Sequence, residues 1–367
     1  MSVSPFGPLR VGPVVVAHTA ASVEADADEE PPSHACDTEV LEVVEAVIEA
    51  LAQAGVSAVS AAVSPRRPEL PDALLKRPGT TIFNLVESTA GAATMEVDFA
   101  RWLEARGVPF TGNPAAALRL ALRKDLTREH LARFDIPMAE GVVAHSPDVA
   151  LPDMPGPWFV KPAWADGSIG IDEGAMVEDA ERCQARVAWL MRHLEGPCLV
   201  ERYLPGPELY VALLPRRGTV HTATTAVDFR RCPAGTLPIV SYDCKWTPGT
   251  PAYHARSVDA RELVDEATIA IAEQIARATF VALGCHGYAR VDMRLDEDGL
   301  PRVIDVNPNP DLHPEAGLAI AAGQIGIPYD DLVLRIAAEA RTEKVHHARP
   351  TYRAQRSRAA GRPARAY

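Results

Sequence analysis

One antiparallel hairpin constrains the fold of this chain more tightly than any other segment. Asp298 and Gly299 form a pair that favours a two-residue turn, and the segments 291–295 and 302–306 on either side alternate apolar and polar residues. Such a turn sets a single register along the whole hairpin, which we place at residues 288–307. The register decides which side chains share a face.

That register places four polar side chains on one face of the hairpin. Asp292 lies opposite Asp305 and Arg290 lies opposite Asn307, because side chains alternate between faces along a strand. Opposed carboxylates repel each other unless a cation lies between them, and Mg²⁺ prefers oxygen ligands of this kind. The pattern therefore predicts a magnesium site, and the alternative is a solvated face on which Arg290 pairs with an aspartate. The other face is expected to be apolar: Val291, Met293, Ile304 and Val306.

The first part of the chain predicts a parallel sheet. Apolar runs alternate with segments in which apolar residues recur at helical spacing, and this strand–helix–strand order is typical of a parallel sheet. The strands are expected at 11–17, 56–63, 81–86 and 108–110, and the helices at 41–51 and 95–106. We therefore expect a first α/β domain over residues 1–113.

The rest of the chain predicts two further domains and a tail. A central domain, 114–196, is expected to contain a helical segment at 115–134, strands at 138–144 and 158–162, and a helix at 179–193. A C-terminal domain, 197–341, is expected to contain strands at 199–204 and 208–214, a helix at 260–283, the hairpin, and a last helix at 330–340. Residues 342–367 are basic and poor in apolar residues, which predicts a disordered tail.

The composition excludes several classes of protein. Apolar residues make up 47% of the chain and charged residues 23%, as in globular proteins, and neither a membrane span nor a signal peptide is recognisable. The net charge of −12 argues against a nucleic-acid partner. The six cysteines are scattered without a Cys-x-x-Cys pair, which argues against disulfides and structural zinc and favours a cytoplasmic location.

A lysine before a glycine-containing loop is a candidate phosphate contact. Lysine occurs only five times in the chain, and Lys161 ends a predicted strand before a loop that contains Gly167, Ser168 and Gly170. Glycines let backbone N–H groups approach an anion closely, and a serine adds a further donor. A plain turn is the alternative, because the loop fits neither the P-loop nor the G-x-G-x-x-G pattern.

Two carboxylates flank a bend farther along the chain. Glu201 and Glu208 stand on either side of a Pro-Gly-Pro sequence at 205–207. Such a connection exposes backbone groups that can hydrogen-bond a planar base, and a carboxylate can bind ribose hydroxyls. An ordinary surface turn is the alternative.

In their order and spacing these segments resemble the ATP-grasp superfamily, and most closely the D-alanine–D-alanine ligase family. The resemblance rests on the following motifs: Lys161 with its Gly/Ser loop, Glu201 with Glu208, Lys245 in Tyr-Asp-Cys-Lys-Trp, Arg290-Val-Asp292 and Asp305-Val-Asn307. Residues 83–87 and 107–112 also resemble the family's first domain. The resemblance implies an α/β ATP-grasp fold of three domains, with a parallel-sheet N-terminal domain and with ATP held between the central and C-terminal α+β domains.

The resemblance also implies roles for individual residues. The residues implied to bind ATP are Lys124, Lys161, Ser168, Glu201, Arg202, Tyr203, Leu204, Glu208 and Lys245. Those implied to act in catalysis are Arg290, Lys245 and Ser168, and those implied to bind two Mg²⁺ ions are Asp292, Asp305 and Asn307. The implied reaction joins a small-molecule carboxylate to an amine through an acyl phosphate. No nucleic-acid or membrane partner is expected. The sequence leaves both a monomer and a homodimer as alternatives.

The sequence departs from the family at the amino-acid site. The usual Gly-Gly-x-Ser-x-Glu loop is replaced by residues 17–24, Gly167 replaces a loop serine, and Trp246 stands where a tyrosine is usual. The serine that usually holds the second carboxylate is missing from 307–317. We therefore expect altered amino-acid specificity. The alternatives are a true D-alanine–D-alanine ligase of cell-wall synthesis, in which groups such as Glu87 or His18 make these contacts, and an inactive nucleotide-binding protein.

Overall fold

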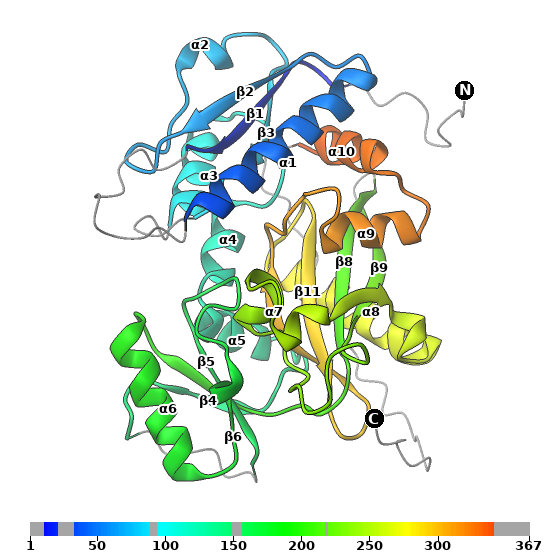
Figure 1. The fold of residues 1–367 in the computed structure, drawn as a ribbon. Helices are drawn as coiled ribbons and strands as arrows, with labels where there is room; N and C mark the ends of the chain where they lie inside the picture. Colours follow the sequence, from blue (N-terminus) through cyan, green and yellow to red (C-terminus); the bar gives the residue numbers. More distant parts are fainter. Residues whose placement is uncertain (1–10, 21–32, 89–93, 149–155, 217–218, 341–367) are drawn as a thin grey trace.

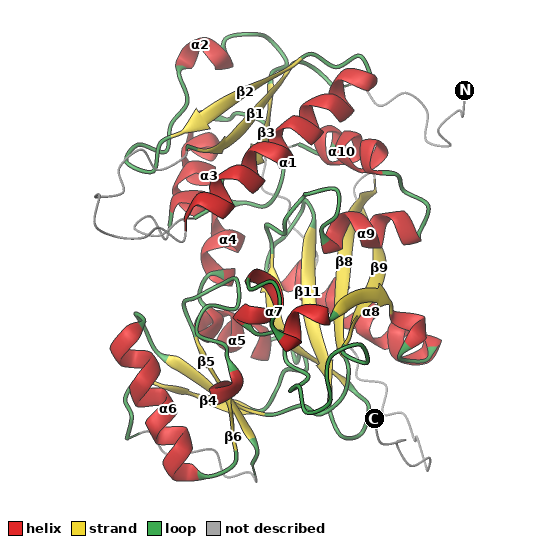
Figure 2. Cartoon of the chain, in the orientation of Figure 1, coloured by secondary structure: helices red, strands yellow, loops and turns green. Residues whose placement is uncertain are grey.

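The structure is a computed structural model, and it describes residues 11–20, 33–88, 94–148, 156–216 and 219–340. The predicted basic tail and residues 21–24 of the segment that replaces the family's glycine loop lie outside the described residues. In the described part, strands form three sheets with helices packed on them, as the sequence predicts for an α/β protein (Figures 1 and 2). No helix in these ranges is long and apolar enough to cross a membrane.

A three-stranded parallel sheet forms the N-terminal layer. Its order is β2 (Ala58–Val63), β1 (Val14–Thr19), β3 (Thr81–Leu85). The two long helices beside it are α1 (Ser33–Gln53) and α3 (Met95–Arg106). Alternation along β1 sends Val14 and Val16 into the core with α1, and Val15 and Ala17 into the core with α3. Helices therefore cover both faces of this sheet, as is usual for parallel sheets.

Two predictions about the end of this layer need correction. The strand predicted at 108–110 is wrong, because only a single bridge joins Phe110 to Ile82. The helical segment predicted at 115–134 is two helices, α4 (Ala115–Ala121) and α5 (Lys124–Ala132). The helix breaks because the backbone N–H of Lys124 donates to the carbonyl of Ala163 (2.9 Å). The break brings Lys124 beside the loop that follows strand β5.

A four-stranded antiparallel sheet forms the second layer. Its order is β4 (Gly141–Ala144), β7 (Cys198–Arg202), β5 (Trp158–Pro162), β6 (Met176–Val177). Helix α6 (Ala180–His193) contributes Cys183, Val187 and Leu190 to the core of this layer. The predicted boundary after residue 196 assigned β7 to the C-terminal domain, but β7 pairs with both β4 and β5. Pairing between distant strands, which the local pattern does not reveal, therefore keeps this sheet intact up to Arg202.

A five-stranded antiparallel sheet forms the third layer. Its order is β10 (Arg256–Asp259), β9 (Thr219–Asp228), β8 (Glu208–Arg216), β11 (Ala289–Leu295), β12 (Pro301–Asn307). Helix α8 (Glu266–Ala282) packs on one face. It starts later than predicted, because Asp265 caps it by accepting the N–H of Thr268 (2.8 Å). Strand β9 was not predicted.

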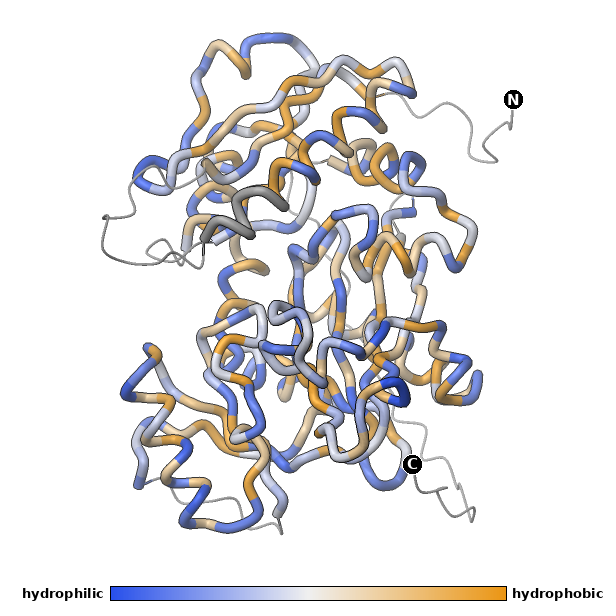
Figure 3. The backbone as a smooth tube through the Cα atoms, in the orientation of Figure 1, coloured by the Kyte–Doolittle hydropathy of each residue, from blue (hydrophilic) through white to orange (hydrophobic). Residues whose placement is uncertain are grey.

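The first and third layers share one apolar core. On β8, Ala212 and Leu214 face helices α9 (Gly317–Gln324) and α10 (Tyr329–Ala338). The same cluster contains Val14 and Val16 of β1, so α10 lies between the two sheets and packs against α1. Figure 3 shows hydrophobic stretches along these strands and helices and hydrophilic stretches in many of the outer loops.

The hairpin pairs the predicted residues, Asp292 with Asp305 and Arg290 with Asn307. Two local features that were not predicted, a longer loop and a bulge, together give this register. The loop is longer than two residues, since Leu295 pairs with Pro301. A bulge beside Asp292 then leaves Ile304 without a partner on β11, and this extra residue restores the register. Asp292 therefore pairs with Asp305 as predicted. The predicted apolar face of the hairpin also needs correction: because of the bulge, it contains Val303 and not Ile304.

Candidate active site

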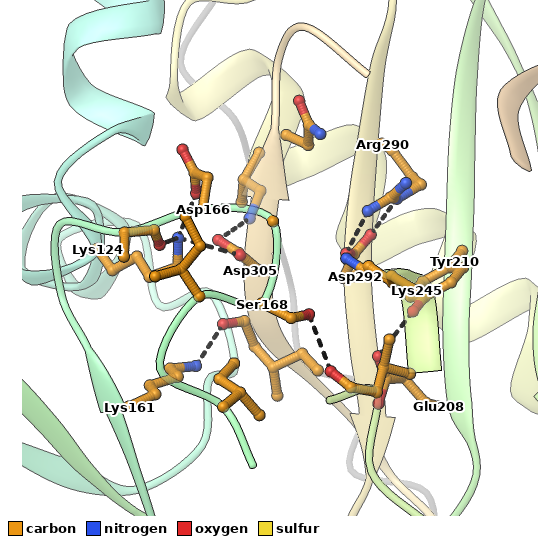
Figure 4. A pocket seen from close by; sticks show the side chains of 18 of the residues that line it. Lys124, Lys161, Asp166, Ser168, Glu208, Tyr210, Lys245, Arg290, Asp292 and Asp305 are labelled. Carbon is orange, nitrogen blue, oxygen red and sulfur yellow. Dashed lines mark hydrogen bonds and ion pairs between the residues drawn. The ribbon is translucent and has the colours of Figure 1, made fainter. Parts of the chain in front are cut away.

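A cleft of about 770 Å³ is lined by all the residues that the family resemblance implies for ATP, catalysis and Mg²⁺. His18, named above as a substrate contact in the alternative, is buried in β1 and is not among the residues that line the cleft. The walls of the cleft come from the second and third layers, from α4 and the start of α5, and from the first turn of α3. Figure 4 labels charged and polar side chains that line it. The proposed residues that line it are Lys124, Lys161, Ser168, Glu201, Arg202, Tyr203, Leu204, Glu208, Lys245, Arg290, Asp292, Asp305 and Asn307. The fold thus brings together segments that lie up to about half the chain apart.

Arg290 and Asp292 form a bidentate pair on β11. Arg290 Nε and Nη2 donate to the two carboxylate oxygens of Asp292 at 2.6 and 2.8 Å. The guanidinium also lies over the ring of Tyr210 on β8, 4.6 Å from its centre. Burial lowers the pKa of Arg290, but the neighbouring Asp292 outweighs burial and the net shift is upward. The pairing of Arg290 with an aspartate, given above as an alternative, is therefore present, on a face that lines the cleft.

Lys124 joins two segments of the cleft wall. Its Nζ lies 2.6 Å from Asp166 Oδ1, 3.0 Å from the carbonyl of Ala165 and 3.2 Å from Asp305 Oδ2. Burial lowers the pKa of Lys124, but Asp305 and Asp166 outweigh it, so the ammonium group is strongly favoured. Burial raises the pKa of Asp305, but Lys124 and Lys161 produce a net downward shift. Both groups are thus held in their charged forms.

Lys161 and Glu201 form a buried ion pair on the second sheet. Lys161 Nζ lies 2.8 Å from Glu201 Oε2 and donates to the carbonyl of the bulged Ile304 at 2.8 Å. Arg128, on α5, approaches the other carboxylate oxygen of Glu201 at 3.0 Å. The bulge in β12 therefore presents a carbonyl that helps to position Lys161.

Glu208 lines the end of the cleft that lies beside the Pro-Gly-Pro bend at 205–207. Tyr210 donates to Glu208 Oε1 at 3.0 Å, and Arg294 donates to Oε2 at 3.4 Å. Arg294 also donates to the hydroxyl of Tyr203 (3.1 Å). Burial raises the pKa of Glu208, and Arg294 opposes that shift only in part. This end of the cleft combines a carboxylate with the aromatic ring of Tyr203.

Lys245 lies in the short helix α7 (Tyr242–Trp246), which borders the cleft. Burial lowers its pKa, and the nearby positive charge of Arg290 lowers it further. Figure 4 shows Lys245 beside Asp292, Tyr210 and Glu208, on the opposite side of Asp305 from Lys124. The cationic side chains are therefore distributed on both sides of the hairpin carboxylates.

The Gly/Ser loop is bonded to the segment that contains α7. Ser168 has a left-handed backbone conformation (φ 64°), and its hydroxyl donates to the carbonyl of Val240 at 2.9 Å. Trp246 Nε1 donates to the carbonyl of Gly167 at 2.9 Å. The hydroxyl of Ser168 thus has a protein partner, and the two segments meet over the cleft.

Glu96 is a cleft residue that the sequence analysis missed. It lies in the first turn of α3, is 9% exposed, and accepts a hydrogen bond from Asn309 Nδ2 at 3.3 Å. Burial raises its pKa to about 7, against the opposing effect of Asn309, and the charges of Asp166 and Glu87 raise it further. An acidic residue in the first turn of a helix is common, so the sequence held no signal that singled out Glu96.

The hairpin face has a donor set that suits Mg²⁺. Asp292, Asp305 and Asn307 all supply oxygen atoms, which a hard cation prefers. Each already has a protein partner, and that of Asn307 is the N–H of Asn309 at 3.0 Å. Among the described residues no cluster of three His, Cys, Asp or Glu side chains is arranged for a metal. A metal there would therefore need the amide of Asn307 and oxygens of a substrate.

Comparisons with known proteins identify first the fold and then the family of this chain. The chain has the fold of a D-alanine–D-alanine ligase from Bacillus anthracis, solved as a complex with ATP, with a TM-score of 0.65 and 17% identity over 90% of this chain and 97% of that chain. The profile of the family described as D-ala D-ala ligase C-terminus matches residues 150–338, about half of the sequence. The chain belongs to the D-alanine–D-alanine ligase family.

Two relatives show how far the sequence has diverged. A D-alanine–D-alanine ligase of Gluconobacter oxydans is 29% identical over 290 residues, which cover 78% of this chain and 89% of that protein. A D-alanine–D-alanine ligase of Saccharophagus degradans is 30% identical over 241 residues, 65% of this chain and 70% of that protein.

Proposed function

We propose that the protein is an ATP- and Mg²⁺-dependent ligase that joins a carboxylate to an amine. The observation that carries the proposal is that three lysines, Arg290 and the hairpin carboxylates meet in one cleft. A carboxylate substrate attacks the γ-phosphate of ATP, which gives an acyl phosphate and ADP. The amine then attacks the acyl carbon, an amide bond forms, and phosphate and a proton leave.

The charged side chains of the cleft suit this chemistry. Lys124, Lys161 and Lys245 would bind phosphate oxygens, and Arg290 would stabilise the negative charge that develops during transfer. Glu208 would bind ribose hydroxyls, and residues 201–204 would border the adenine. Asp292, Asp305 and Asn307 would hold two Mg²⁺ ions, which neutralise phosphate charge when bound. The protein's contribution is to position reactants and to balance charge.

The same cleft supports a change in substrate specificity. Glu87, Glu96 and Glu315 line the part of the cleft near α3 and the 307–317 segment, and Asn309 lies among them. An acidic wall of this kind attracts a cationic amine and repels an additional carboxylate. We therefore propose an amine substrate that lacks the carboxylate of D-alanine. A true D-alanine–D-alanine ligase and a protein without catalysis remain the competing functions.

An ADP-release screen tests the proposed function. Purified protein with Mg²⁺ and ATP would be offered amino acids, hydroxy acids, dipeptides and simple amines in combination. We expect ADP release with a carboxylate plus a cationic amine, and little with D-alanine alone at millimolar concentration. Efficient formation of D-alanyl-D-alanine would contradict the altered specificity. The absence of ADP release from all pairs, with intact ATP binding, would favour a nucleotide-binding protein.

The remaining features of the proposal concern organisation. We propose three domains, with the central one extended to Arg202 because β7 completes its sheet. The substrates are small molecules. The five cysteines that the structure describes are free, and we propose a cytoplasmic location on that basis. A homodimer is a further proposal, to be tested by light scattering.

A further inference from the structure

Asn113 connects the segment after the first sheet to the two strand ends that form the open end of the hairpin. Its side chain is 1% exposed. Asn113 Nδ2 donates to the carbonyls of Tyr288 and Pro308, both at 2.6 Å. Its Oδ1 accepts the backbone N–H groups of His286 (2.9 Å) and Gly287 (3.3 Å). The amide thus uses both of its donors and both acceptor positions on backbone groups.

The bonded carbonyls lie directly beside the residues that we assign to the reaction. Tyr288 precedes the start of β11, and Pro308 follows the end of β12. Arg290 follows Tyr288 by two residues, Asn307 directly precedes Pro308, and Arg290 pairs with Asn307 across the two strands. One side chain therefore spans the open end of the hairpin and fixes the distance between the two strands there.

Close backbone contact explains how Asn113 reaches this position. A Cβ atom on Gly287 would lie 2.4 Å from the carbonyl oxygen of Gly112, so only glycine fits at 287 without a shift of the backbone. Gly112 itself has a φ of +88°, which few other residues adopt. The two segments thus touch backbone to backbone, and the short side chain of Asn113 can bond four groups at once.

We propose that Asn113 is a positioning residue, which holds Arg290 and Asn307 at the separation that the hairpin face needs to bind a divalent cation with a nucleotide. This inference rests on the proposed function. Loss of the side chain leaves two buried carbonyls and two buried N–H groups without these partners, and such groups move to find others or to reach water. The open end of the hairpin is then free to widen, while the closed end at residues 296–300 keeps its own bonds.

The test compares Asn113→Ala with Thr279→Ala. Thr279 is also a buried polar residue bonded to a backbone carbonyl, that of Ile275 at 2.9 Å, but it lies in α8 on the other face of the sheet. Binding of Mn²⁺ would be measured by electron paramagnetic resonance in the presence of ADP. Binding of ADP without metal would be measured by calorimetry, and melting temperature would be recorded for each variant.

We expect Asn113→Ala to weaken Mn²⁺ binding at least tenfold and to leave metal-free ADP binding within twofold of wild type. Thr279→Ala should lower the melting temperature without changing either affinity. A purely structural role for Asn113 would give the result of the control, and Mn²⁺ affinity within twofold of wild type would overturn the inference.

A second variant guards against misfolding. Asn113→Ser keeps a short, uncharged polar side chain at this buried position but cannot bond both carbonyls and both N–H groups at once. We expect it to fold and also to bind Mn²⁺ at least tenfold more weakly, and wild-type affinity in this variant would overturn the inference as well. If the wild-type protein binds neither ADP nor Mn²⁺ with ADP, the proposed function fails instead, so the two failures are distinguishable.

Discussion

The charged side chains of the cleft form ion pairs with one another. Lys161 pairs with Glu201, Arg290 with Asp292, and Lys124 with two aspartates. Because most of these charges are buried, removing one partner leaves the other without compensation, which is costly. A substitution at this site therefore affects stability as well as reactivity, and experiments must separate the two.

Arg290→Ala should lower kcat about 10²- to 10³-fold, since the variant lacks a cation at the developing charge. It should also lower the free energy of unfolding by about 3 kcal/mol, because Asp292 loses a bidentate partner in a buried site. Steady-state ADP release and urea unfolding measure the two effects. Arg335→Ala is the control, since Arg335 donates to Asp331 at 2.7 Å on α10, away from the cleft. Unchanged kcat in Arg290→Ala would contradict the site assignment.

Glu96 should make stability depend on pH in a defined window. Its pKa is raised from 4.5 to about 7 in the folded protein, so the folded state disfavours the carboxylate form. Ionising Glu96 in the folded protein therefore lowers the free energy of unfolding. This loss is absent below the unfolded pKa, grows as pH rises from about 4.5 to 7, and is then constant at up to about 3 kcal/mol. Glu96→Gln should therefore raise the free energy of unfolding at pH 8 and leave it nearly unchanged at pH 4.5.

Urea titrations at the two pH values check this difference directly. Glu69→Gln is a suitable control, since Glu69 is a partly exposed residue that pairs with Arg67 outside the cleft. If the free energy of unfolding changes with pH in the same way in wild type and Glu96→Gln, Glu96 is not the source of the pH dependence.

The Gly/Ser loop and α7 are two elements held together by few bonds. Besides the contacts of Ser168 and Trp246, the backbone N–H of Tyr242 donates to the carbonyl of Ile171 at 2.9 Å. Trp246→Phe keeps an aromatic ring and removes one donor, which costs about 1 kcal/mol. We expect roughly fivefold weaker ATP binding and faster amide exchange in residues 163–171, with little change in melting temperature.

Exchange mass spectrometry and calorimetry measure these two effects. Trp189→Phe is the matched control, because Trp189 is also partly exposed and lies on α6 outside the cleft. Wild-type exchange in the loop of Trp246→Phe would mean that the indole bond does not hold the two elements together.

Local patterns predicted most elements but not the contacts between them. Alternation and helical spacing identified β1, α3 and both strands of the hairpin. The hairpin partners were predicted correctly although the loop is longer than assumed, because the bulge at Ile304 compensates for it. The carbonyl of the bulged Ile304 accepts a hydrogen bond from Lys161 on another sheet, and the local sequence does not reveal such a contact.

The same reason explains the residues that the sequence analysis missed. Arg128 lies on α5, more than seventy residues before Glu201 in the chain. Its Nη1 nevertheless lies 3.0 Å from Glu201 Oε1. The placement of β7 beside β4 likewise depends on partners distant in sequence. By contrast, the candidate site residues could be proposed because their order along the chain resembles a known family.

The shared core between the first and third layers predicts the result of truncation. Deletion of residues 341–367, which lie outside the described part, should leave melting temperature and ADP release nearly unchanged. Deletion from Tyr329 onward should destabilise the whole protein, because Leu332, Val333 and Ile336 of α10 belong to the core that joins both sheets. Differential scanning calorimetry of the two truncated proteins makes the comparison. A large loss of stability in the shorter deletion would show that the basic tail packs on the body.

The position of α10 also has a consequence for synthesis on the ribosome. The core cluster of Val14 and Val16 contains α1, but it is completed by apolar residues of α9 and α10, which leave the ribosomal exit tunnel long after β1 and α1. The first sheet and α1 therefore emerge early, but the side of α1 that packs against α10 stays uncovered during most of translation. Contacts over such a sequence separation form slowly, and exposed apolar surface promotes aggregation. The nascent chain is consequently a better client for chaperones than a protein whose first domain folds on its own.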